Sequence, residues 1–247
     1  MISVEEHGDI GIVRLENGQV NVLDLDLLRA LTETFRSQAG AGALVLTGAG
    51  RAFSAGVDLR RILDGGREYA AAFLPALSTA FRTVFDHPRP VVAAVNGHAI
   101  AGGCILVAAC DVRLMSAGTI GVTELPVGVP FPPSALETLR FAVGPATARL
   151  VLTGQTLSPA DAAAVGLVDE VVDPASLLDE ALSRARQLAN IPTETFRLTK
   201  AQLRGRTSER IDADEVAYAD RLLDAWTGVP ARRAISRYLD QLKSRRA

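Results

Sequence analysis

The 247-residue sequence has few of the residues that mark a disulfide-stabilised, metal-binding or nucleic-acid-binding protein. Its two cysteines, Cys104 and Cys110, lie in an apolar stretch without a C-x-x-C pair, so we expect two buried thiols in a reducing cytoplasm. Only two of the 26 basic residues are lysine, and 28 acidic residues leave a net charge of −2. This balance argues against broad binding to nucleic acid or to an anionic membrane.

Long hydrophobic runs are also missing. No stretch approaches the roughly 18–20 apolar residues that are needed to cross a bilayer. The acidic segment Met1–Glu6 lacks the basic region and apolar run of a secretory signal, so we expect a cytoplasmic protein. The chain is instead rich in ordinary core residues, with 48% hydrophobic residues. At this length a full core forms without disulfides or a structural metal.

Hydrophobic patterning predicts an α/β protein. Alternating runs at Ile2–Glu6 and Ile10–Leu15 flank Gly8-Asp9 and predict a hairpin. Continuous apolar runs predict strands buried on both faces, whereas helical spacing predicts amphipathic helices. The remaining strands are expected at Ala43–Thr47, Pro90–Asn96, Asp111–Met115, Ile120–Gly121 and Val168–Val172, and the helices from Leu23 to about Gly40, over Tyr69–Phe85, from Pro159 after the N-cap residue Ser158, and over about Pro174–Ala189.

The break Asn190–Pro192 separates this α/β part from a tail without strand-like runs. The apolar residues of the tail cannot all be buried within it, so we expect it to pack on the core or on another subunit. We therefore divide the chain into a core of residues 1–190 and a C-terminal helical region of residues 191–247. The tail is predicted to form three helices at Thr193–Leu203, Ser208–Trp226 and Pro230–Leu242.

Three familiar catalytic patterns are incomplete in this sequence. Gly48–Gly50 follows a strand, but Phe53 stands where the third glycine of a dinucleotide fingerprint belongs. Ser54 lacks the first glycine of a nucleophile elbow, which argues against a serine hydrolase. The third pattern, a histidine paired with an aspartate at a recognisable distance, is also missing. The histidines are scattered and are expected to be structural: His7, His87 and His98.

Two segments, Leu44–Leu59 and Val91–Cys104, combine a buried strand, a glycine-containing turn and a helix start. Small residues at such turns leave backbone N–H groups unobstructed, and a helix N-terminus adds about half a positive charge. Two such turns brought together make an oxyanion hole. For either turn alone, the simpler explanation is that its glycines merely permit a tight strand-to-helix connection.

Taken together, Phe53–Leu59 and Ala94–Cys104 resemble the two signature segments of the crotonase superfamily, the enoyl-CoA hydratases and isomerases. Leu152–Asp169 and Arg197–Lys200 resemble further family stretches, so the resemblance covers the whole chain. It implies a spiral of strand-strand-helix repeats with a C-terminal helical trimerisation region, the trimers often pairing into hexamers. It also implies an enzyme that binds an acyl-CoA thioester and needs no cofactor beyond the CoA of its substrate.

The resemblance also places the site. The thioester oxygen is expected to accept hydrogen bonds from the backbone N–H groups of Val57 and Gly102, with Ala101 where many members have glycine. CoA is expected along Ala55, Gly56, Asp58, Leu59 and Arg60, with Asp58 as a turn or N-cap residue rather than a base. Candidate phosphate partners are Arg60, Arg61 and, from a neighbouring subunit, the C-terminal Lys243 or Arg245.

The carboxylates decide the expected reaction. Hydratases of this family hold a water with two glutamates, and this sequence has Ile105 at the first of those places and Glu124 at the second. One carboxylate suffices to move a proton from C2 to C4, which shifts a 3-enoyl-CoA double bond to the 2 position. We expect Ile105, Leu125 and Val127 to surround Glu124 and to raise its pKa.

Two further segments favour an isomerase with its own acyl pocket. Val20–Leu23 resembles an early segment of the isomerases, and the proline-rich Val129–Pro133 predicts a stiff loop that reshapes the acyl pocket. Two alternatives stay open: a hydratase that uses Glu124 alone or with Glu137, and a non-catalytic acyl-CoA-binding member. The expected partners are the acyl-CoA and further copies of the chain, without nucleic acid or membrane.

Overall fold

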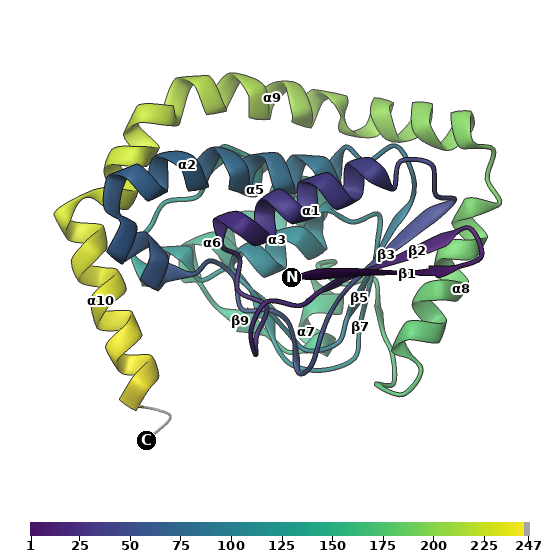
Figure 1. Ribbon diagram of the computed structural model, residues 1–247, viewed down its shortest axis with the longest axis horizontal. Coiled ribbons are helices and arrows are strands. Elements are labelled where there is room, and N and C mark those ends of the chain that lie inside the picture. Colours follow the sequence, from purple (N-terminus) through teal and green to yellow (C-terminus); the bar gives the residue numbers. More distant parts are fainter. Residues whose placement is uncertain (245–247) are drawn as a thin grey trace.

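Two sheets carry the strands of the computed structural model, which describes residues 1–244 (Figure 1). The larger sheet has the order β1-β2-β3-β5-β7-β10 and the smaller sheet the order β4-β6-β8-β9. The strands of the larger sheet are β1 (Ile2–His7), β2 (Ile10–Leu15), β3 (Ala43–Gly48), β5 (Val91–Val95), β7 (Val112–Met115) and β10 (Glu170–Val171). Those of the smaller sheet are β4 (Ala52–Ser54), β6 (His98–Ile100), β8 (Ile120–Gly121) and β9 (Thr156–Leu157).

The helices alternate with pairs of strands along the chain. Three successive units, β3-β4-α2, β5-β6-α3 and β7-β8-α4, each place their first strand in the larger sheet and their second in the smaller one. Neighbouring units pair in parallel in both sheets, which confirms the predicted spiral of strand-strand-helix repeats. The helices are α1 (Leu25–Ser37), α2 (Leu59–Phe85), α3 (Gly102–Ala109), α4 (Glu124–Val127), α5 (Pro133–Val143), α6 (Thr147–Thr153), α7 (Pro159–Ala164), α8 (Leu177–Ala189), α9 (Thr193–Thr227) and α10 (Val229–Ser244), with a 3-10 turn at Gly144–Ala146.

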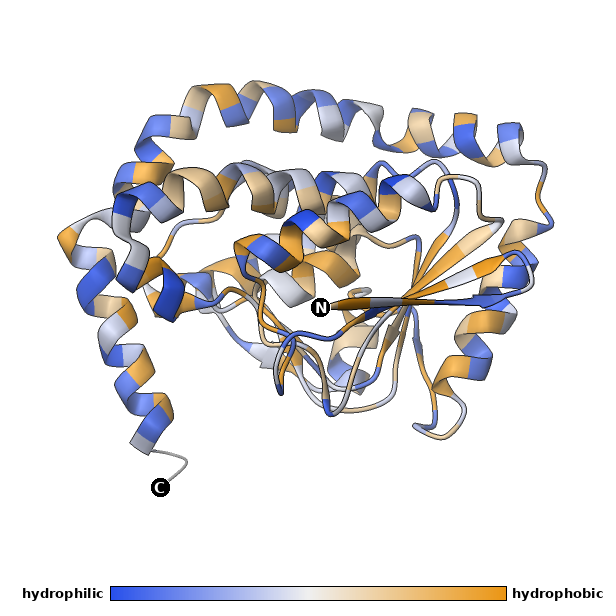
Figure 2. Cartoon of the chain, in the orientation of Figure 1, coloured by the Kyte–Doolittle hydropathy of each residue, from blue (hydrophilic) through white to orange (hydrophobic). Residues whose placement is uncertain are grey.

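Strands β3 and β5 are buried on both faces, as their continuous apolar runs predict. Successive side chains of a strand point to opposite faces, so Leu44 and Leu46 join the main core while Ala43 and Val45 pack with α8. Figure 2 shows these strands as an apolar layer between the mixed surfaces of the surrounding helices. The expected hairpin, the Ser158 N-cap and the helix α8 are also confirmed.

Helix α2 begins at Leu59, ten residues before the predicted Tyr69. The Asp58 side chain caps it by accepting hydrogen bonds from the N–H groups of Arg60 and Arg61. A break at Gly66, where φ is 54°, interrupts the helical spacing. Because of this break, hydrophobic periodicity does not predict the first turns of the helix.

The predicted division of the tail into three helices is wrong. Residues Thr193–Thr227 form one helix, α9, which crosses α2 and α5 along one side of the molecule (Figure 1). Gly205 in its middle costs about 1 kcal/mol relative to alanine, but the flanking Arg204 and Thr207 are buried against the core and hold both halves in line. Among the helices of residues 1–244, none is both long and apolar enough to span a membrane.

Candidate active site

Three turns from distant parts of the sequence meet at one edge of the smaller sheet. Strands β4, β6 and β8 are neighbours and run parallel, so their carboxyl ends lie at the same edge. The turn at residues 55–58 follows β4, the turn at Ala101 follows β6, and the segment leading to Glu124 follows β8. The spiral topology thus brings the two glycine-containing turns and Glu124 together.

The first two turns approach each other closely enough to require glycine. A Cβ atom on Gly56, where φ is 81°, would lie 2.6 Å from the carbonyl oxygen of Ile100. A Cβ atom on Gly103 would lie 2.5 Å from the carbonyl oxygen of Ser54. Side chains at either place would push the turns apart.

The segment Val20–Leu23 fixes the first turn from behind. Asn21 is fully buried, and its side-chain amide donates hydrogen bonds to the carbonyl oxygens of Ala49, Ala52 and Phe53 at 2.9–3.2 Å. The Leu23 N–H donates to the Gly56 carbonyl, and the Asp58 N–H donates to the Leu23 carbonyl. The backbone of the turn is therefore held before any ligand arrives.

Two backbone donors in these turns are unused. The hydrogen bonds between Val20–Leu23 and the first turn use the N–H of Asp58 but not that of Val57. Gly102 is the first residue of α3, so its N–H has no acceptor within the helix. Within residues 1–244 neither N–H finds an acceptor, and both residues line the same cavity.

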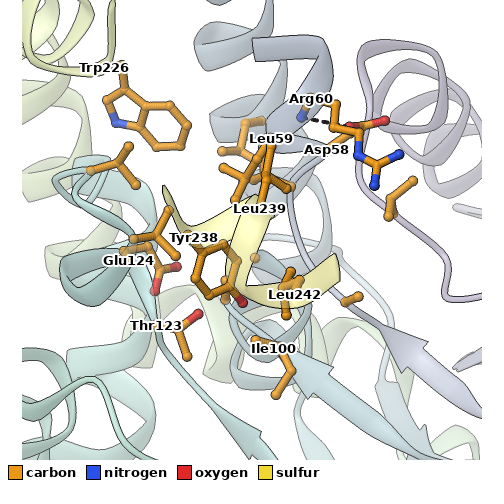
Figure 3. A pocket seen from close by; sticks show the side chains of 18 of the residues that line it. Asp58, Leu59, Arg60, Ile100, Thr123, Glu124, Trp226, Tyr238, Leu239 and Leu242 are labelled. Carbon is orange, nitrogen blue, oxygen red and sulfur yellow. Dashed lines mark hydrogen bonds between the residues drawn. The ribbon is translucent and has the colours of Figure 1, made fainter. Parts of the chain in front are cut away.

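The cavity has a volume of about 440 Å³ and a largely apolar wall (Figure 3). Its charged lining residues are Asp58 and Arg60 at the start of α2, Lys243 on α10, and Glu124. The C-terminal helices close it, because Trp226 at the end of α9 and Tyr238 on α10 form part of the wall. The apolar lining is Val20, Val22, Ala55, Val57, Leu59, Leu77, Phe81, Ile100, Ala101, Gly102, Val127, Val129, Pro132, Ala135, Trp226, Leu239 and Leu242.

Glu124 is a buried acid that has, within residues 1–244, one unpartnered carboxylate oxygen and no charged partner. It begins α4 directly after β8, and its side chain lies in the cavity wall between Thr123 and Val127. The residue is 8% exposed, and its Oε2 atom has no hydrogen-bond partner in the described part of the chain. Burial raises the pKa of Glu124 to about 7, although the backbone N–H groups of Glu124 and Thr123 oppose the shift.

Most of the sequence-predicted residues lie around this cavity. Beside Glu124, Val57 and Gly102, the wall includes Ala55, Asp58, Leu59, Arg60 and Val127. Gly56 lies behind the wall, in the turn itself. Ile105 is a correction: it is fully buried in the main core and does not line the cavity, because α3 is enclosed on all sides and turns this residue inward.

The other candidate charges have partners. Glu137 on α5 is 3% exposed and forms ion pairs with Arg140 and, at 3.3 Å, with Arg210 of α9, outside the cavity lining. Arg61 pairs with Asp24 and Asp26, each at 3.3 Å, and does not line the cavity. Of the two C-terminal cations, Lys243 lines the cavity and Arg245 lies outside the described residues.

Two wall residues, Trp226 and Tyr238, were missed by the sequence argument. Trp226 is among the apolar residues that the tail must bury, but its spacing does not say which element it faces, and Tyr238 is not among those residues. One sequence feature could have singled out Trp226: it is the only tryptophan in the chain.

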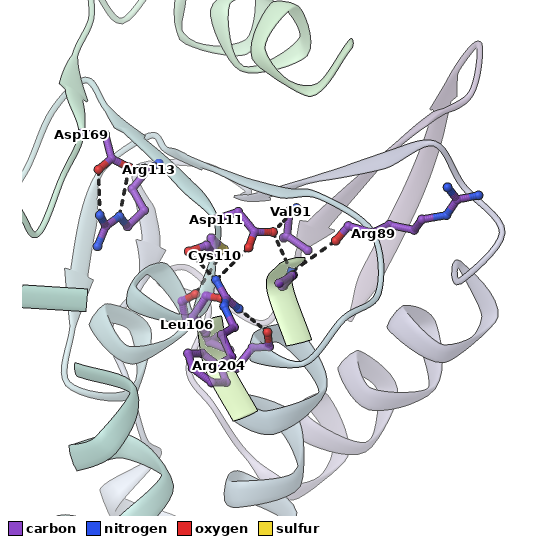
Figure 4. Close-up of polar contacts among 11 residues, drawn as sticks. Arg89, Val91, Leu106, Cys110, Asp111, Arg113, Asp169 and Arg204 are labelled. Carbon is purple, nitrogen blue, oxygen red and sulfur yellow. Dashed lines mark hydrogen bonds and ion pairs between the residues drawn. The ribbon is translucent and has the colours of Figure 1, made fainter. Parts of the chain in front are cut away.

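A second buried charged cluster lies away from the cavity, where α9 packs on the core (Figure 4). Asp111 pairs with Lys200 at 2.7 Å and with Arg204 at 2.8 Å, and it accepts a hydrogen bond from the Val91 N–H at 2.8 Å. Arg204 also donates to the carbonyl oxygens of Phe85 and Ala109. Burial lowers the pKa of Lys200 to about 8, against the attraction of Asp111.

The remaining polar candidates are structural. Cys104 and Cys110 are buried free thiols, as expected. His87 is buried edge-on against Phe35, and burial together with Lys200 and Arg89 lowers its pKa to about 4. Residues 1–244 contain no group of three or more histidine, cysteine or acidic side chains arranged to hold a metal ion.

Comparison with known proteins agrees with this architecture. The family model described as enoyl-CoA hydratase/isomerase matches residues 5–245. A putative enoyl-CoA hydratase of Thermus thermophilus is 36% identical over 213 residues, which are 82% of this chain and 83% of the relative. The chain therefore belongs to the enoyl-CoA hydratase/isomerase family of crotonase-fold enzymes.

Solved structures of the family superpose on most or all of the chain. The crystal structure of human mitochondrial delta3-delta2-enoyl-CoA isomerase has a TM-score of 0.95 at 27% identity and covers 100% of this chain and 99% of the human one. An enoyl-CoA hydratase of Mycobacterium ulcerans has a TM-score of 0.83 at 30% identity, covering 87% of this chain and 97% of the other. Relatives named for both reactions thus share the fold, so the reaction must be argued from the site.

Proposed function

We propose that this chain shifts the double bond of a 3-enoyl-CoA to the 2 position, with Glu124 as its single acid and base. The observation that carries the proposal is one buried carboxylate that has, among the described residues, an unpartnered oxygen and no charged partner, in an apolar cavity whose wall also contains two unused backbone N–H groups. Isomerisation needs one group that removes a proton and returns it at a different carbon. It needs no second carboxylate and no cofactor beyond the CoA of the substrate.

The reaction proceeds through an enolate-like intermediate. Glu124 removes a proton from C2 of the 3-enoyl thioester, and the electron pair of that bond spreads over C2, C4 and the thioester oxygen. The N–H groups of Val57 and Gly102 then donate to this oxygen, each contributing about 2.7–4 kcal/mol as fixed donors in a dry site. Glu124 returns the proton to C4, which leaves the double bond between C2 and C3 and restores the carboxylate.

The environment of Glu124 suits both halves of this cycle. A pKa of about 7 leaves a substantial fraction of the carboxylate ionised near neutral pH, ready to act as a base. The same pKa makes the protonated form a better acid–base match for C4 than an ordinary glutamate would be. Burial in the cavity wall supplies this property without a neighbouring charge.

Hydration of a 2-enoyl-CoA is the second candidate, because several relatives are named hydratases. A water held for attack on C3 requires a second orienting carboxylate in the hydratase arrangement. Within the cavity lining of the described residues, the acids are Glu124 and Asp58, and Asp58 is occupied in capping α2. Glu137 is neutralised by Arg140 and Arg210 outside the cavity, which disfavours its use with Glu124.

The CoA portion of the substrate is proposed to lie along Ala55–Arg60, with Arg60 and Lys243 as partners for its phosphates. Lys243 lines the cavity of its own chain, which favours a contact within the subunit over the expected contact from a neighbour. The family likeness also supports a homotrimer, or a hexamer of two trimers. Its contact surface would include exposed apolar residues of α9: Leu198, Leu203 and Val216. We further propose residues 1–190 as the acyl-CoA-binding core and 191–247 as the oligomerisation region and cover of the site.

The two reactions are separated by incubating the wild type and Glu124→Gln with a 3-enoyl-CoA and, separately, a 2-enoyl-CoA in deuterated water. The proposal expects conversion of the 3-enoyl substrate, with deuterium at C4 in those turnovers in which the protonated Glu124 exchanges with solvent before it returns the proton, and loss of conversion in the variant. A 3-hydroxyacyl product that carries solvent oxygen would make the enzyme a hydratase instead. Binding of acyl-CoA with neither conversion nor deuterium uptake from either substrate would indicate a binding role.

A further inference from the structure

The apolar end of the cavity is closed by Trp226. This residue lies at the end of α9, is 2% exposed, and contributes its indole to the cavity wall. Leu77 and Phe81 of α2 and Ala135 of α5 line the cavity with it, so helices from three parts of the chain surround the space. No charged or polar group is found among these four wall residues, apart from the indole N–H.

The indole is held in a fixed position. Its Nε1–H donates a hydrogen bond of 2.9 Å to the carbonyl oxygen of Pro130. Pro130 belongs to the loop Val129–Pro133, whose three prolines restrict the backbone. On the other side the ring of Phe73 lies 6.5 Å from the indole, centroid to centroid. A buried aromatic side chain fixed by a hydrogen bond and by packing cannot easily move aside for a longer ligand.

The position of Trp226 along the cavity matches the far end of an acyl chain. Figure 3 shows Trp226 on the side of the cavity opposite Arg60 and Asp58, with Glu124 on the Trp226 side. A thioester whose CoA portion lies near Arg60 and whose reacting carbons lie near Glu124 would therefore extend its remaining carbons towards the indole. The Pro130 carbonyl oxygen would be a polar atom at this apolar end, but it already accepts the hydrogen bond of the indole N–H.

The size of the cavity sets a scale for the chain. A dry cavity of about 150 Å³ accommodates benzene, with six carbons. On that scale a cavity of 440 Å³ holds on the order of 18 carbon-sized atoms. The thioester and the adjoining part of the pantetheine arm share this space, so the room left for the acyl chain is limited.

We propose that Trp226 sets the upper limit of acyl-chain length, so that the substrates are short- to medium-chain enoyl-CoA thioesters and long chains are excluded. The inference rests on the proposed acyl-CoA site, but not on which reaction occurs there. Trp226 acts here as a specificity-determining residue, because it contacts the end of the chain and not the reacting atoms.

The test measures binding, without turnover, of saturated butanoyl-, octanoyl- and dodecanoyl-CoA to the wild type and to Trp226→Ala by titration calorimetry. Each methylene that becomes buried tightens binding by about fourfold. The wild type is expected to gain affinity from butanoyl to octanoyl and none from octanoyl to dodecanoyl. Trp226→Ala is expected to bind dodecanoyl-CoA about 16- to 64-fold more tightly than the wild type does, because two or three more methylenes are buried. Its affinity for butanoyl-CoA stays unchanged.

Two further variants separate chain length from damage to the fold. Trp226→Phe keeps an aromatic ring and loses the bond to Pro130, so it should shift the preference less than alanine does. Phe85→Leu removes an aromatic side chain that packs on Phe141 and Arg204 outside the cavity lining, and it should leave the preference unchanged.

The inference is overturned if the wild type binds dodecanoyl-CoA more tightly than octanoyl-CoA, or if folded Trp226→Ala keeps the wild-type preference. Failure of every thioester to bind the wild type would overturn it together with the acyl-CoA site. A shifted preference in a protein that does not convert 3-enoyl-CoA would support this inference and overturn only the proposed isomerisation.

Discussion

Two largely enclosed carboxylates of this protein, Glu124 and Asp111, have opposite surroundings. Asp111 is enclosed by Lys200, Arg204 and the Val91 N–H, and each of its oxygens has a partner (Figure 4). Glu124 lies at 8% exposure in an apolar cavity wall with Oε2 unpartnered (Figure 3). Two acids at similar depth therefore differ in whether the fold satisfies their charge.

The difference indicates which acid serves the fold and which serves the chemistry. A buried charge with complete partners joins elements that would otherwise separate, and Asp111 joins α9 to the core in this way. A buried acid without partners is costly to the fold whenever it is ionised. Such a cost is retained where a shifted pKa is useful, which is the setting of a general base.

The largest effect expected from this contrast is on turnover. Glu124→Gln keeps the size of the side chain and removes its proton transfer, so kcat/KM for a 3-enoyl-CoA should fall about 10³- to 10⁴-fold. In the wild type, kcat/KM should rise with pH and level off above about 7, because the ionised form is the base. Stopped-flow absorbance measurements over pH 5 to 9 would check both statements.

Glu137→Gln is the matched control for this experiment. It removes an acid of the same type that is equally buried but is paired with Arg140 and Arg210 outside the cavity. Activity per folded molecule should be retained. Loss of activity in both variants to the same extent would contradict the assignment of a single catalytic carboxylate.

The next largest effect is on stability, at the other acid. Asp111→Ala leaves Lys200 and Arg204 buried without their carboxylate, and the free energy of unfolding should fall by about 3–5 kcal/mol. Urea denaturation measures this loss. Asp224→Ala, which removes an ion pair with Arg67 in which both side chains are more than half exposed, should cost less than about 1 kcal/mol. Equal losses in the two variants would remove the distinction between a buried and a surface pair.

A third prediction concerns the cost of ionising Glu124. Its pKa is about 7 in the folded protein and near 4.5 in the unfolded chain, so the unfolded state releases the proton first as the pH rises. The wild type should therefore lose stability between about pH 4.5 and 7, by up to ~3 kcal/mol, and keep this deficit at higher pH. Glu124→Gln lacks this titration, so it should exceed the wild type in stability at pH 8 and not at pH 4.5.

Chemical denaturation of both proteins at the two pH values is the measurement. Denaturation of Glu137→Gln at the same pH values provides a comparison that removes a paired acid. A stability difference between the wild type and Glu124→Gln that does not change with pH would show that Glu124 is not a buried acid with a raised pKa.

The sequence predicted the secondary structure around the site better than it predicted which charged side chains pair with one another. The strands around both glycine-containing turns follow from local patterning, and the fold class follows from their order. The positions of Val57 and Gly102 follow from the resemblance of the two turns to the family's signature segments, and the close backbone approach at Gly56 and Gly103 explains why glycine stands beside them. The strands and their order depend on neighbours in the chain, which a sequence displays directly.

Features that depend on tertiary placement could not be predicted in the same way. The pairing of Glu137 with Arg210 joins residues on α5 and α9, and no spacing rule links them. Ile105 lies next to the second glycine turn in sequence, yet the enclosed helix α3 turns it into the core. The continuity of α9 through Gly205 is likewise decided by the packing of Arg204 and Thr207, against the local preference of glycine.

The smallest predicted effect concerns the backbone at the second turn. Ala101 has φ of 51° and ψ of −121°, a conformation that costs a non-glycine residue about 1–3 kcal/mol. Ala101→Gly relieves this strain but adds about 0.4–1 kcal/mol of conformational entropy to the unfolded state. The net result should be a gain in stability of about 1 kcal/mol, measured by urea denaturation.

Turnover of a 3-enoyl-CoA should be unchanged in Ala101→Gly, because the proposed donor is the N–H of Gly102 and not the Ala101 methyl group. Gly40→Ala is the control for the reverse substitution, from glycine to alanine. The added Cβ atom would meet no neighbour within 4 Å, and Gly40 lies outside the cavity lining. A fall in stability or in kcat/KM for Ala101→Gly would show that the methyl group holds the second turn against Gly56. The strained alanine would then be part of what positions the oxyanion donor.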